Sequence, residues 1–348
     1  MQTPCKNISY LAFSVIAITF LFTSESFAHQ VLGHYPLCEA SAAITISCPD
    51  GNQDCLLVAD NEQRDNLFLF PIQGNTVNTK IQKPLPLNFK DAKEISDIEA
   101  LTSISKDNIL VFGSHSRNKS CKAKKKRRRF ASFLITNNMA NLVSLNKSKK
   151  ISCKHIFIND PQDNPVQNAV CKTIDIEEAM SEKECNLATP FNIEGVVNVS
   201  TTKQPDIWAG LRAPLLKEHP MKPKLKNLAI LLHMANSNQF KFTDIALLDL
   251  KDRGIRELAV LKDEVWVIAG PASDSDTLFQ LYRFPTSALN GDEVIHPDYV
   301  SDLPPSSEGL AFYKNKAFIV TDGDIGNSMD NECLKPSYFF EINLPVLP

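Results

Sequence analysis

The amino-acid sequence predicts an all-β protein, a β-propeller of five or six blades, from two observations. Short apolar runs bounded by turn residues fill most of the chain, as at 109–112 and 317–320, and such runs favour strands over helices. A glutamate that opens an apolar strand also recurs, with gaps of 60, 95, 63 and 51 residues between successive glutamates. Four-stranded propeller blades repeat at about 40–60 residues. A pair of β-sandwiches is the alternative fold, but it would not repeat this order.

Five repeating units follow one another along the chain. Their marker glutamates are Glu39, Glu99, Glu194, Glu257 and Glu308. The predicted strands are 43–46, 56–59 and 66–70; 109–112 and 130–135; 192–197, 207–209, 229–232 and 245–248; 254–260, 265–271 and 279–284; and 307–312, 317–320 and 338–342. Trp208 and Trp266 lie within such strands and are expected in the core. We interpret 137–190 as a helical or irregular insertion with one helix near 174–185, or as a sixth blade.

The N-terminus is typical of a secretory signal peptide. Lys6 precedes an apolar run of 15 residues at 8–22, which is short for a membrane span of roughly 20 residues. Small residues at Ser26 and Ala28 predict cleavage after Ala28. The prediction is therefore a signal peptide at 1–28 and a single propeller domain at 29–348, located in the periplasm or secreted. An uncleaved membrane anchor is the alternative.

Charge and cysteine content limit the possible partners. The 37 basic and 40 acidic residues nearly balance, so overall charge gives no case for nucleic acid or a membrane surface as the main partner, and we expect a monomer. A basic run at 124–129 is interpreted as a solvated hairpin loop.

Eight cysteines follow the signal peptide, an even number that indicates disulfides in an exported protein. Zinc is the alternative, but no Cys-x-x-Cys pair exists. The proposed pairs are Cys48–Cys55, Cys171–Cys185 and Cys38–Cys333.

The repeat predicts a ring of charged side chains. The inner strands of a propeller face one central channel, so residues that open successive inner strands converge at one channel mouth. Several carboxylates this close are unfavourable unless a cation or arginines balance them. Arg117, Arg212 and Arg256 accompany the glutamates. Arg117 and Arg212 each follow a glutamate by 18 residues, so we expect them in equivalent places.

Several sequence blocks resemble a known family. The blocks are DIEAL…GSHSR, NIEGV…GLRAP, GIREL…AGP and SEGLAF…TDGD, preceded by EASA…VADNE. In this order they resemble the bacterial domain-of-unknown-function 3616 family over nearly the whole mature chain. The resemblance implies a β-propeller-like fold and no established activity. The chain departs from the family pattern at Ala100, where glycine is more usual. A weaker similarity runs to gluconolactonase-like and phytase-like propellers, in which comparable carboxylates hold a divalent metal in the channel.

The candidate metal ligands are the carboxylates expected at the channel. They are Glu99, Glu194, Glu308 and Asp322, with Asp60 as a further strand-end ligand. Hard oxygen ligands favour calcium or magnesium over zinc, and we expect calcium rather than magnesium. The alternative is structural: a buried carboxylate can accept backbone N–H bonds and fasten adjacent blades.

The remaining candidates would handle a substrate. Arg117, Arg212 and Arg256 could bind a phosphate or carboxylate, or pair with the ring glutamates. His115 could move a proton, or simply be hydrogen-bonded at a strand end. The predicted function is binding of a divalent cation and an anionic small molecule, with hydrolysis of an ester, lactone or phosphate as the reaction, by a metal-dependent hydrolase. The alternative is a non-catalytic propeller scaffold that binds an exported protein or glycan.

Overall fold

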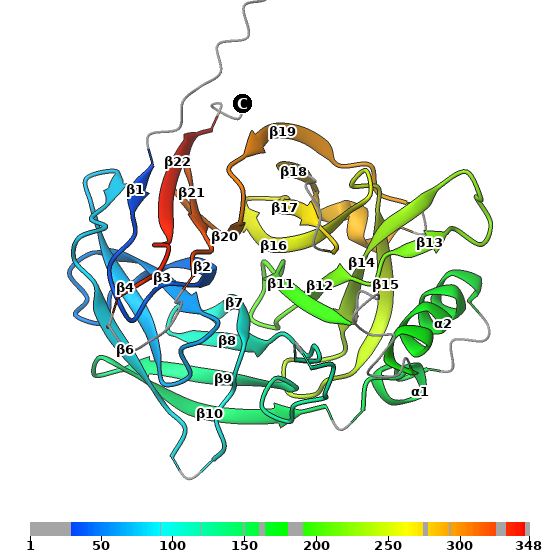
Figure 1. The fold of residues 1–348 in the computed structure, drawn as a ribbon, viewed down its shortest axis with the longest axis horizontal. Coiled ribbons are helices and arrows are strands. Elements are labelled where there is room, and N and C mark those ends of the chain that lie inside the picture. Colours follow the sequence, from blue (N-terminus) through cyan, green and yellow to red (C-terminus); the bar gives the residue numbers. More distant parts are fainter. Residues whose placement is uncertain are drawn as a thin grey trace, which may run out of the picture.

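The strands form five blades around a common centre (Figure 1). This computed structural model describes residues 29–90, 92–118, 120–148, 150–159, 164–179, 191–273, 278–291, 294–324 and 332–344. The predicted signal peptide at 1–28 lies outside these residues. The prediction of an all-β propeller is confirmed, and the described part of the chain has five blades rather than six.

Each blade is an antiparallel sheet of four main strands. The first two blades contain β2 (Ala40–Ser47), β3 (Asp54–Asp60), β4 (Asn66–Gln73) and β6 (Lys83–Asn88), then β7 (Ile98–Ser105), β8 (Asn108–Gly113), β9 (Arg129–Thr136) and β10 (Met139–Lys147). The third and fourth contain β11 (Asn192–Asn198), β12 (Ile207–Ala213), β14 (Lys226–Met234) and β15 (Phe242–Leu248), then β16 (Arg253–Leu261), β17 (Glu264–Pro271), β18 (Phe279–Pro285) and β19 (Asp298–Leu303). The fifth contains β20 (Ser307–Tyr313), β21 (Lys316–Thr321), β22 (Tyr338–Asn343) and β1 (Gln30–Val31). Short additions are β5 (Thr76–Val77), β13 (Leu216–Glu218) and the 3₁₀ helix η3 (Thr286–Asn290).

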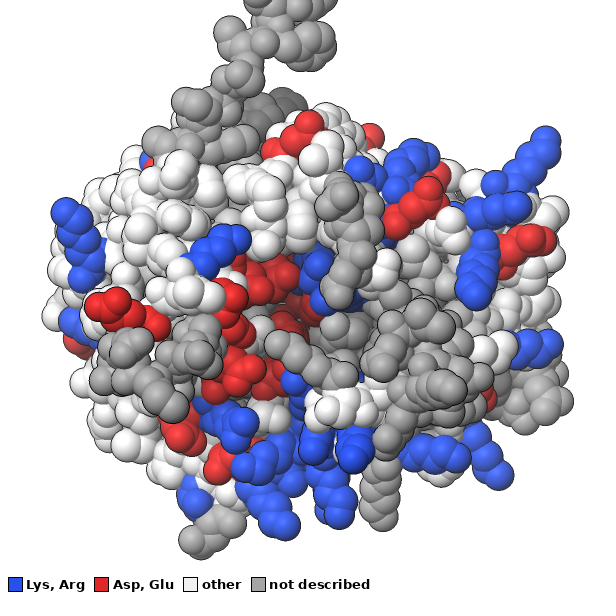
Figure 2. Space-filling view, in the orientation of Figure 1, with Lys and Arg blue, Asp and Glu red and all other residues white. Residues whose placement is uncertain are grey.

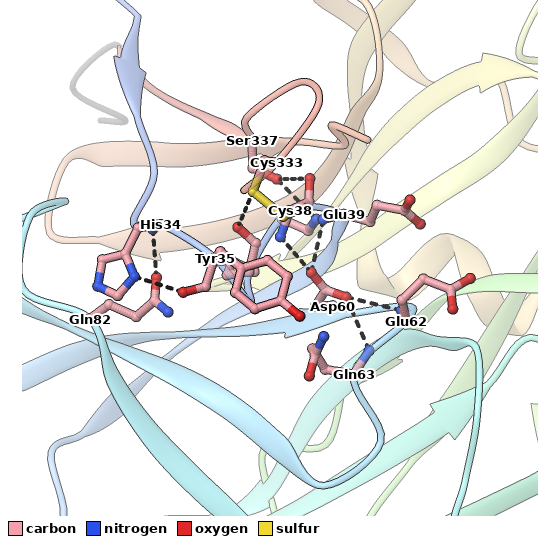
Figure 3. Close-up of a disulfide and its surroundings, with 12 residues drawn as sticks. His34, Tyr35, Cys38, Glu39, Asp60, Glu62, Gln63, Gln82, Cys333 and Ser337 are labelled. Carbon is pink, nitrogen blue, oxygen red and sulfur yellow. Dashed lines mark hydrogen bonds between the residues drawn. A yellow bond between two sulfur atoms is a disulfide. The ribbon is translucent and has the colours of Figure 1, made fainter. Parts of the chain in front are cut away.

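The two ends of the chain close the ring together. Strand β1 pairs antiparallel with β22, with Gln30 opposite Phe339. A disulfide then joins Cys38 to Cys333, which are 295 residues apart in sequence, as predicted (Figure 3). A cross-link over so long a loop removes much conformational freedom from the unfolded chain. The fifth blade is therefore assembled from both ends of the chain, and the ring closes without an open seam.

The first two blades are also joined at their outer edges. Strand β6 pairs in parallel with β10, and Asn88 Nδ2 donates to Asn141 Oδ1 at 3.0 Å. The pairing covers a sheet edge that would otherwise expose unpaired N–H and C=O groups. Together these strands make one continuous sheet from β2 to β7.

The insertion after β10 contains two helices, α1 (Cys153–Ile156) and α2 (Pro165–Ala179). Helix α2 begins earlier than predicted because Asn164 caps it: its Oδ1 accepts the backbone N–H groups of Val166 and Gln167, each at 3.0 Å. None of the described helices is long and apolar enough to cross a bilayer.

Two further disulfides join described residues. Cys48 pairs with Cys55 as predicted. The predicted Cys171–Cys185 pair is wrong, because α2 packs on α1 and brings Cys171 within a Cα–Cα distance of 5.1 Å of Cys153, its actual partner. Cys121 is disulfide-bonded as well.

Apolar clusters fill the spaces between neighbouring blades. The largest cluster lies between the second and third blades and includes the inward faces of α1 and α2. Trp208 and Trp266 are almost fully buried, as predicted. The blades are thus held by interlocking side chains, and the inner strands β2, β7, β11, β16 and β20 surround the centre (Figure 1).

Candidate functional site: the ring at the channel mouth

Every inner strand carries a β-bulge near its first residues. The register between the inner strand and its neighbour skips one residue in each blade, and a bulge re-aims the side chain that it leaves unpaired. The skipped residues are Ser41, Glu99, Glu194, Arg256 and Glu308. These five side chains occupy equivalent positions and form a ring, which we call the bulge ring.

The bulge ring corrects the register expected from the sequence. Glu99, Glu194 and Glu308 occupy equivalent places, but Glu39 precedes β2 and Glu257 lies one residue beyond the ring position of its blade. Ser41 and Arg256 hold those places instead. Counting residues between glutamates misses this shift because a bulge adds one residue without changing the strand pattern.

Glycine after a ring residue has a steric reason. A Cβ atom on Gly195 would lie 2.9 Å from the backbone nitrogen of Leu258, and one on Gly309 would lie 2.9 Å from that of Ala43. Backbones of the inner strands therefore approach closely just past the ring at these two positions. The second blade has Ala100 at this position, fully buried.

Arg256 lies between two ring glutamates. Its Nη1 is 2.9 Å from Glu194 Oε2 and 2.8 Å from Glu308 Oε1. Arg212 Nη1 lies 3.1 Å from the other oxygen of Glu194. Burial opposes the charged form of Arg256, but the coulombic attraction of Glu194 and Glu308 outweighs it and raises the pKa of Arg256 above its usual value. The fourth blade, whose ring residue is Arg256, thus supplies the cation that balances the glutamates of both neighbouring blades.

A pocket of about 320 Å³ opens beside this ion-pair cluster. Its lining residues are Arg212, Arg256, Pro271, Ser273, Phe279, Ser306, Glu308 and Asp322. Burial raises the pKa of Glu308 to about 7, against the opposing effect of Arg256. Burial and the nearby Glu308 raise the pKa of Asp322 to about 9. We call this the arginine pocket; it holds two guanidinium groups beside two carboxyl groups that take up protons near neutral pH.

Glu99 lies on the opposite side of the ring and has a different environment. Its neighbours in the ring are Ser41 and Glu194, and Ser41 Oγ donates to the carbonyl of Ile98 at 2.5 Å. No hydrogen bond links the carboxyl group of Glu99 to another described residue. Burial, followed by repulsion from Asp97 and Glu194, raises its pKa well above the usual value. Glu99 is therefore a buried carboxyl group that has no arginine partner among the described residues.

Glu257 is a fully buried carboxyl group on β16, one residue beyond the ring position of Arg256. Its Oε1 accepts the N–H of Leu258 at 2.9 Å, whereas its buried Oε2 has no hydrogen-bond partner among the described residues. Burial raises the pKa of Glu257 well above its usual value. The hydrogen bond between Glu257 and Leu258 lies within β16 itself.

His115 lies beside the second blade in an apolar contact. Its ring stacks on Phe240 with 4.1 Å between centroids, and its Nδ1 lies 2.8 Å from the carbonyl of Gly113. The side chain is fully buried, and burial lowers its pKa to about 3. His115 is therefore neutral at physiological pH, and it is not among the residues that line the arginine pocket.

Arg117 does not occupy the place of Arg212. Ile98 pairs with Gly113 and Ile193 pairs with Leu211, so Ser114 is the residue equivalent to Arg212. The expected equivalence of Arg117 and Arg212 is therefore wrong: the chain turns after Gly113, with a left-handed φ of 59° at His115. Arg117 instead donates to the carbonyl of Cys121 at 3.3 Å.

Two further aspartates shape the mouth. Asp60 accepts the backbone N–H groups of Cys38 and Glu39, each at 2.8 Å, and of Glu62 and Gln63 at 3.0 and 3.1 Å (Figure 3). Burial nevertheless raises the pKa of Asp60 to about 6. It fixes the chain entering β2 against the chain leaving β3.

Asp97 was not singled out from the sequence as a functional residue. It has a left-handed φ of 58°, pairs with Arg127 at 2.7 Å, and accepts the hydroxyl of Ser114. Burial raises its pKa. The sequence signal that could have identified Asp97 was its position two residues before the ring residue Glu99.

The face that carries the mouth shows the charge pattern directly. Acidic side chains gather round a hollow at its centre, and basic side chains follow one edge of that hollow (Figure 2). Across the described parts of the chain, no three His, Cys, Asp or Glu side chains are arranged so that they could hold a metal ion together. Calcium binding by Glu99, Glu194, Glu308 and Asp322 stays a prediction.

Comparison with known proteins identifies the family. The model of the family described as "Protein of unknown function (DUF3616)" matches residues 46–308. The chain belongs to the DUF3616 family. The family resemblance seen in the sequence blocks is thereby confirmed. No curated protein matches the sequence.

Several solved structures are similar to the DUF3616 chain at low identity. A glucose dehydrogenase-like oxidoreductase of Thermus thermophilus has 7% identity and a TM-score of 0.42, with 91% of this chain and 100% of that chain covered. Hydrazine synthase of Kuenenia stuttgartiensis has 8% identity and a TM-score of 0.36, with 84% and 58% covered. The endosialidase of phage phi92 has 8% identity and a TM-score of 0.31, with 91% and 49% covered. The chain thus spans about half the length of the last two.

Proposed function

We propose that this DUF3616 protein binds an anionic small molecule in the arginine pocket, outside the cytoplasm. The observation that carries the proposal is that Arg212 and Arg256 line one pocket with Glu308 and Asp322. Guanidinium groups bind carboxylates and phosphates through charge-assisted hydrogen bonds. The disulfides support an oxidising compartment, either the periplasm or the external medium.

The two carboxyl groups support a hydrolytic reaction. With a pKa of about 9, Asp322 carries a proton at neutral pH and can donate it to a leaving oxygen. With a pKa of about 7, Glu308 is partly ionised and can accept a proton from water. Efficient proton-transfer groups have pKa values near the working pH. We propose an ester or lactone with an anionic group as the substrate, with Glu308 and Asp322 in the proton-transfer roles first considered for His115.

A divalent cation remains part of the proposal. Calcium would lie on the side of the bulge ring where Glu99 has no described arginine partner, because carboxylate oxygens are the ligands that calcium prefers. Glu194 and Glu308 would then be shared between the cation and Arg256.

Binding to the arginine pocket can be tested by calorimetry. The oxidised mature protein would be titrated with gluconate, 6-phosphogluconate and neutral glucose, and assayed for hydrolysis of glucono-δ-lactone and its 6-phosphate. We expect the anions to bind and Arg212→Gln to weaken binding by about tenfold, the effect of losing one charge-assisted contact. Arg283→Gln is the matched control, because Arg283 pairs with Glu264 away from the pocket.

The outcomes separate an anion site from a scaffold. If Arg212→Gln left the affinity for the anions unchanged, the proposed binding in the arginine pocket would be contradicted. If none of the anions binds while Glu194→Ala still destabilises the fold, the non-catalytic scaffold becomes the better interpretation. The ion pairs that join Glu194, Arg256 and Glu308 across three blades favour that second function.

A further inference from the structure

The basic run between β8 and β9 forms part of the rim of the channel mouth. Ser96 N–H donates to the carbonyl of Lys126 at 3.2 Å, and His115 N–H donates to that of Arg127 at 3.0 Å. The disulfide at Cys121 adds a covalent restraint. The solvated hairpin expected from the sequence is therefore only half right, because Arg128 and Arg129 are each only 6% exposed. The arginine pocket does not use this loop.

The cations of this loop fall into two groups. Lys126 pairs with Glu94, and Arg127 pairs with Asp97 at 2.7 Å. Lys124 and Lys125 are exposed and form no ion pair with a described carboxylate, and the same holds for Arg64 on the facing loop of the first blade. Uncompensated positive charges that converge from two blades attract an anion.

These three cations line a second pocket, of about 460 Å³. The other lining residues are Asn61, Glu62, Ser96, Asp97, Asn118, Lys126 and Arg127. Its volume lies within the roughly 300–1,000 Å³ of small-molecule sites. Every lining side chain is polar or charged, which disfavours a lipid tail or an aromatic ring. We call it the rim pocket, and it shares no lining residue with the arginine pocket.

We propose that the rim pocket binds a sugar that carries a phosphate or sulfate ester. Lys124, Lys125 and Arg64 would hold the oxyanion through charge-assisted hydrogen bonds. Asn118 and Glu62 offer a donor and an acceptor for sugar hydroxyl groups. The Oδ1 of Asn118 already accepts the N–H of Lys122 at 2.8 Å, which leaves its amide nitrogen as the donor for a sugar hydroxyl group.

The site is also organised before any ligand arrives. Arg127 donates to Ser116 Oγ at 3.0 Å and to the carbonyl of Arg117 at 3.3 Å, while its pair with Asp97 ties the loop to the strand that carries Glu99. A loop that is already ordered loses little conformational freedom on binding. This inference is independent of the proposed function of the arginine pocket.

Calorimetric titration of the oxidised mature protein tests the rim pocket. The probes are glucose 6-phosphate, glucose 6-sulfate, glucose, sodium sulfate and vesicles that contain anionic phospholipid. We expect at least one ester to bind, glucose to bind roughly tenfold more weakly or not at all, and the affinity to fall as salt screens the charges. Binding of one ester alone would identify the oxyanion as phosphate or sulfate.

Paired lysine substitutions locate the site. Lys124→Gln combined with Lys125→Gln should weaken ester binding by roughly tenfold or more. The matched control is Lys106→Gln combined with Lys203→Gln, two exposed lysines in the loops joining β7 to β8 and β11 to β12. The control should bind as the unmodified protein does. Thermal unfolding of both variants confirms that they fold.

Four results would overturn the proposal. If the Lys124/Lys125 variant bound the esters as tightly as the unmodified protein does, the ligand would not lie in the rim pocket. If glucose bound as tightly as its esters, the oxyanion would not contribute to recognition. If sodium sulfate bound as tightly as the sugar esters, the pocket would hold an adventitious ion only. Vesicle binding that the sugar esters do not displace would indicate a membrane surface instead.

Discussion

The two sides of the bulge ring differ in how the charge of their buried carboxyl groups is compensated. On one side, Arg256 lies within 2.9 Å of both Glu194 and Glu308, so one buried cation is shared between two buried carboxyl groups. On the other side, Glu99 has Ser41 and Glu194 as ring neighbours and no described arginine partner, and burial raises its pKa. One side thus has an arginine between its carboxyl groups, whereas on the other side burial and nearby carboxylates raise the pKa of Glu99 with no described arginine to oppose the rise.

The difference shows that equivalent positions in a repeat need not carry equivalent roles. A buried charge is stable only when it is paired or neutralised. The fourth blade has arginine where three other blades have glutamate, and this single exchange divides the ring. The paired side borders the arginine pocket, whereas the unpaired side borders Asp97 and the rim loop.

Removal of Arg256 tests the paired side and should have a large effect on the unfolding free energy. Arg256→Gln leaves Glu194 and Glu308 buried without their shared cation, and breaking such a pair costs about 3–5 kcal/mol. Urea unfolding at neutral pH would measure the loss. Arg283→Gln is the control, since this partly exposed pair with Glu264 at 3.4 Å should contribute less than about 1 kcal/mol. Equal stability of the Arg256 variant would mean that the two sides do not differ as described.

A divalent cation would sharpen the comparison by acting on the unpaired side. If calcium binds near Glu99, protein freed of metal by EDTA should regain about 2.7 kcal/mol of stability when calcium reaches 100 times its Kd. Glu99→Gln should abolish that gain. Thermal unfolding with and without calcium, together with elemental analysis, measures both. If calcium still stabilised the Glu99→Gln protein by the same amount, the calcium site would not include Glu99.

The pH dependence of stability gives the most local test. The pKa of Asp322 is about 9 in the folded protein and about 4 when unfolded. The folded state therefore holds this proton more tightly, and its contribution, complete below about pH 4, is lost as pH rises through 9. Between these values each bound proton changes the unfolding free energy by about 1.4 kcal/mol per pH unit. Asp322→Asn should flatten the fall in stability from pH 5 to 9.

A matched variant isolates the effect of Asp322. Asp298→Asn changes an exposed aspartate of β19 outside the arginine pocket, so the stability of this variant should fall with pH as in the unmodified protein. An Asp322→Asn protein with the original slope would place the proton uptake on other groups, of which Glu308 is the first to examine.

Much of the fold was predictable from the residues alone. Apolar runs bounded by turns indicated the strands, because side-chain burial imposes that pattern locally. The spacing of Glu99, Glu194 and Glu308 indicated blades, and the small loop between Cys48 and Cys55 indicated their disulfide. The alternative in which the arginines pair with ring glutamates agrees with the contact between Arg212 and Glu194, at 3.1 Å.

The membership of the ring depended on tertiary structure. A bulge shifts register by one residue without altering local composition, so the sequence could not show that Arg256, rather than Glu257, completes the ring. Nor could spacing show that Ser114 takes the position expected for Arg117, because a left-handed turn at His115 ends the strand. The Cys153–Cys171 pair likewise needed the packing of α2 on α1. Local patterns determined which segments become strands, whereas the approach of backbones from different blades decided which side chains meet, because that approach depends on packing over the whole ring.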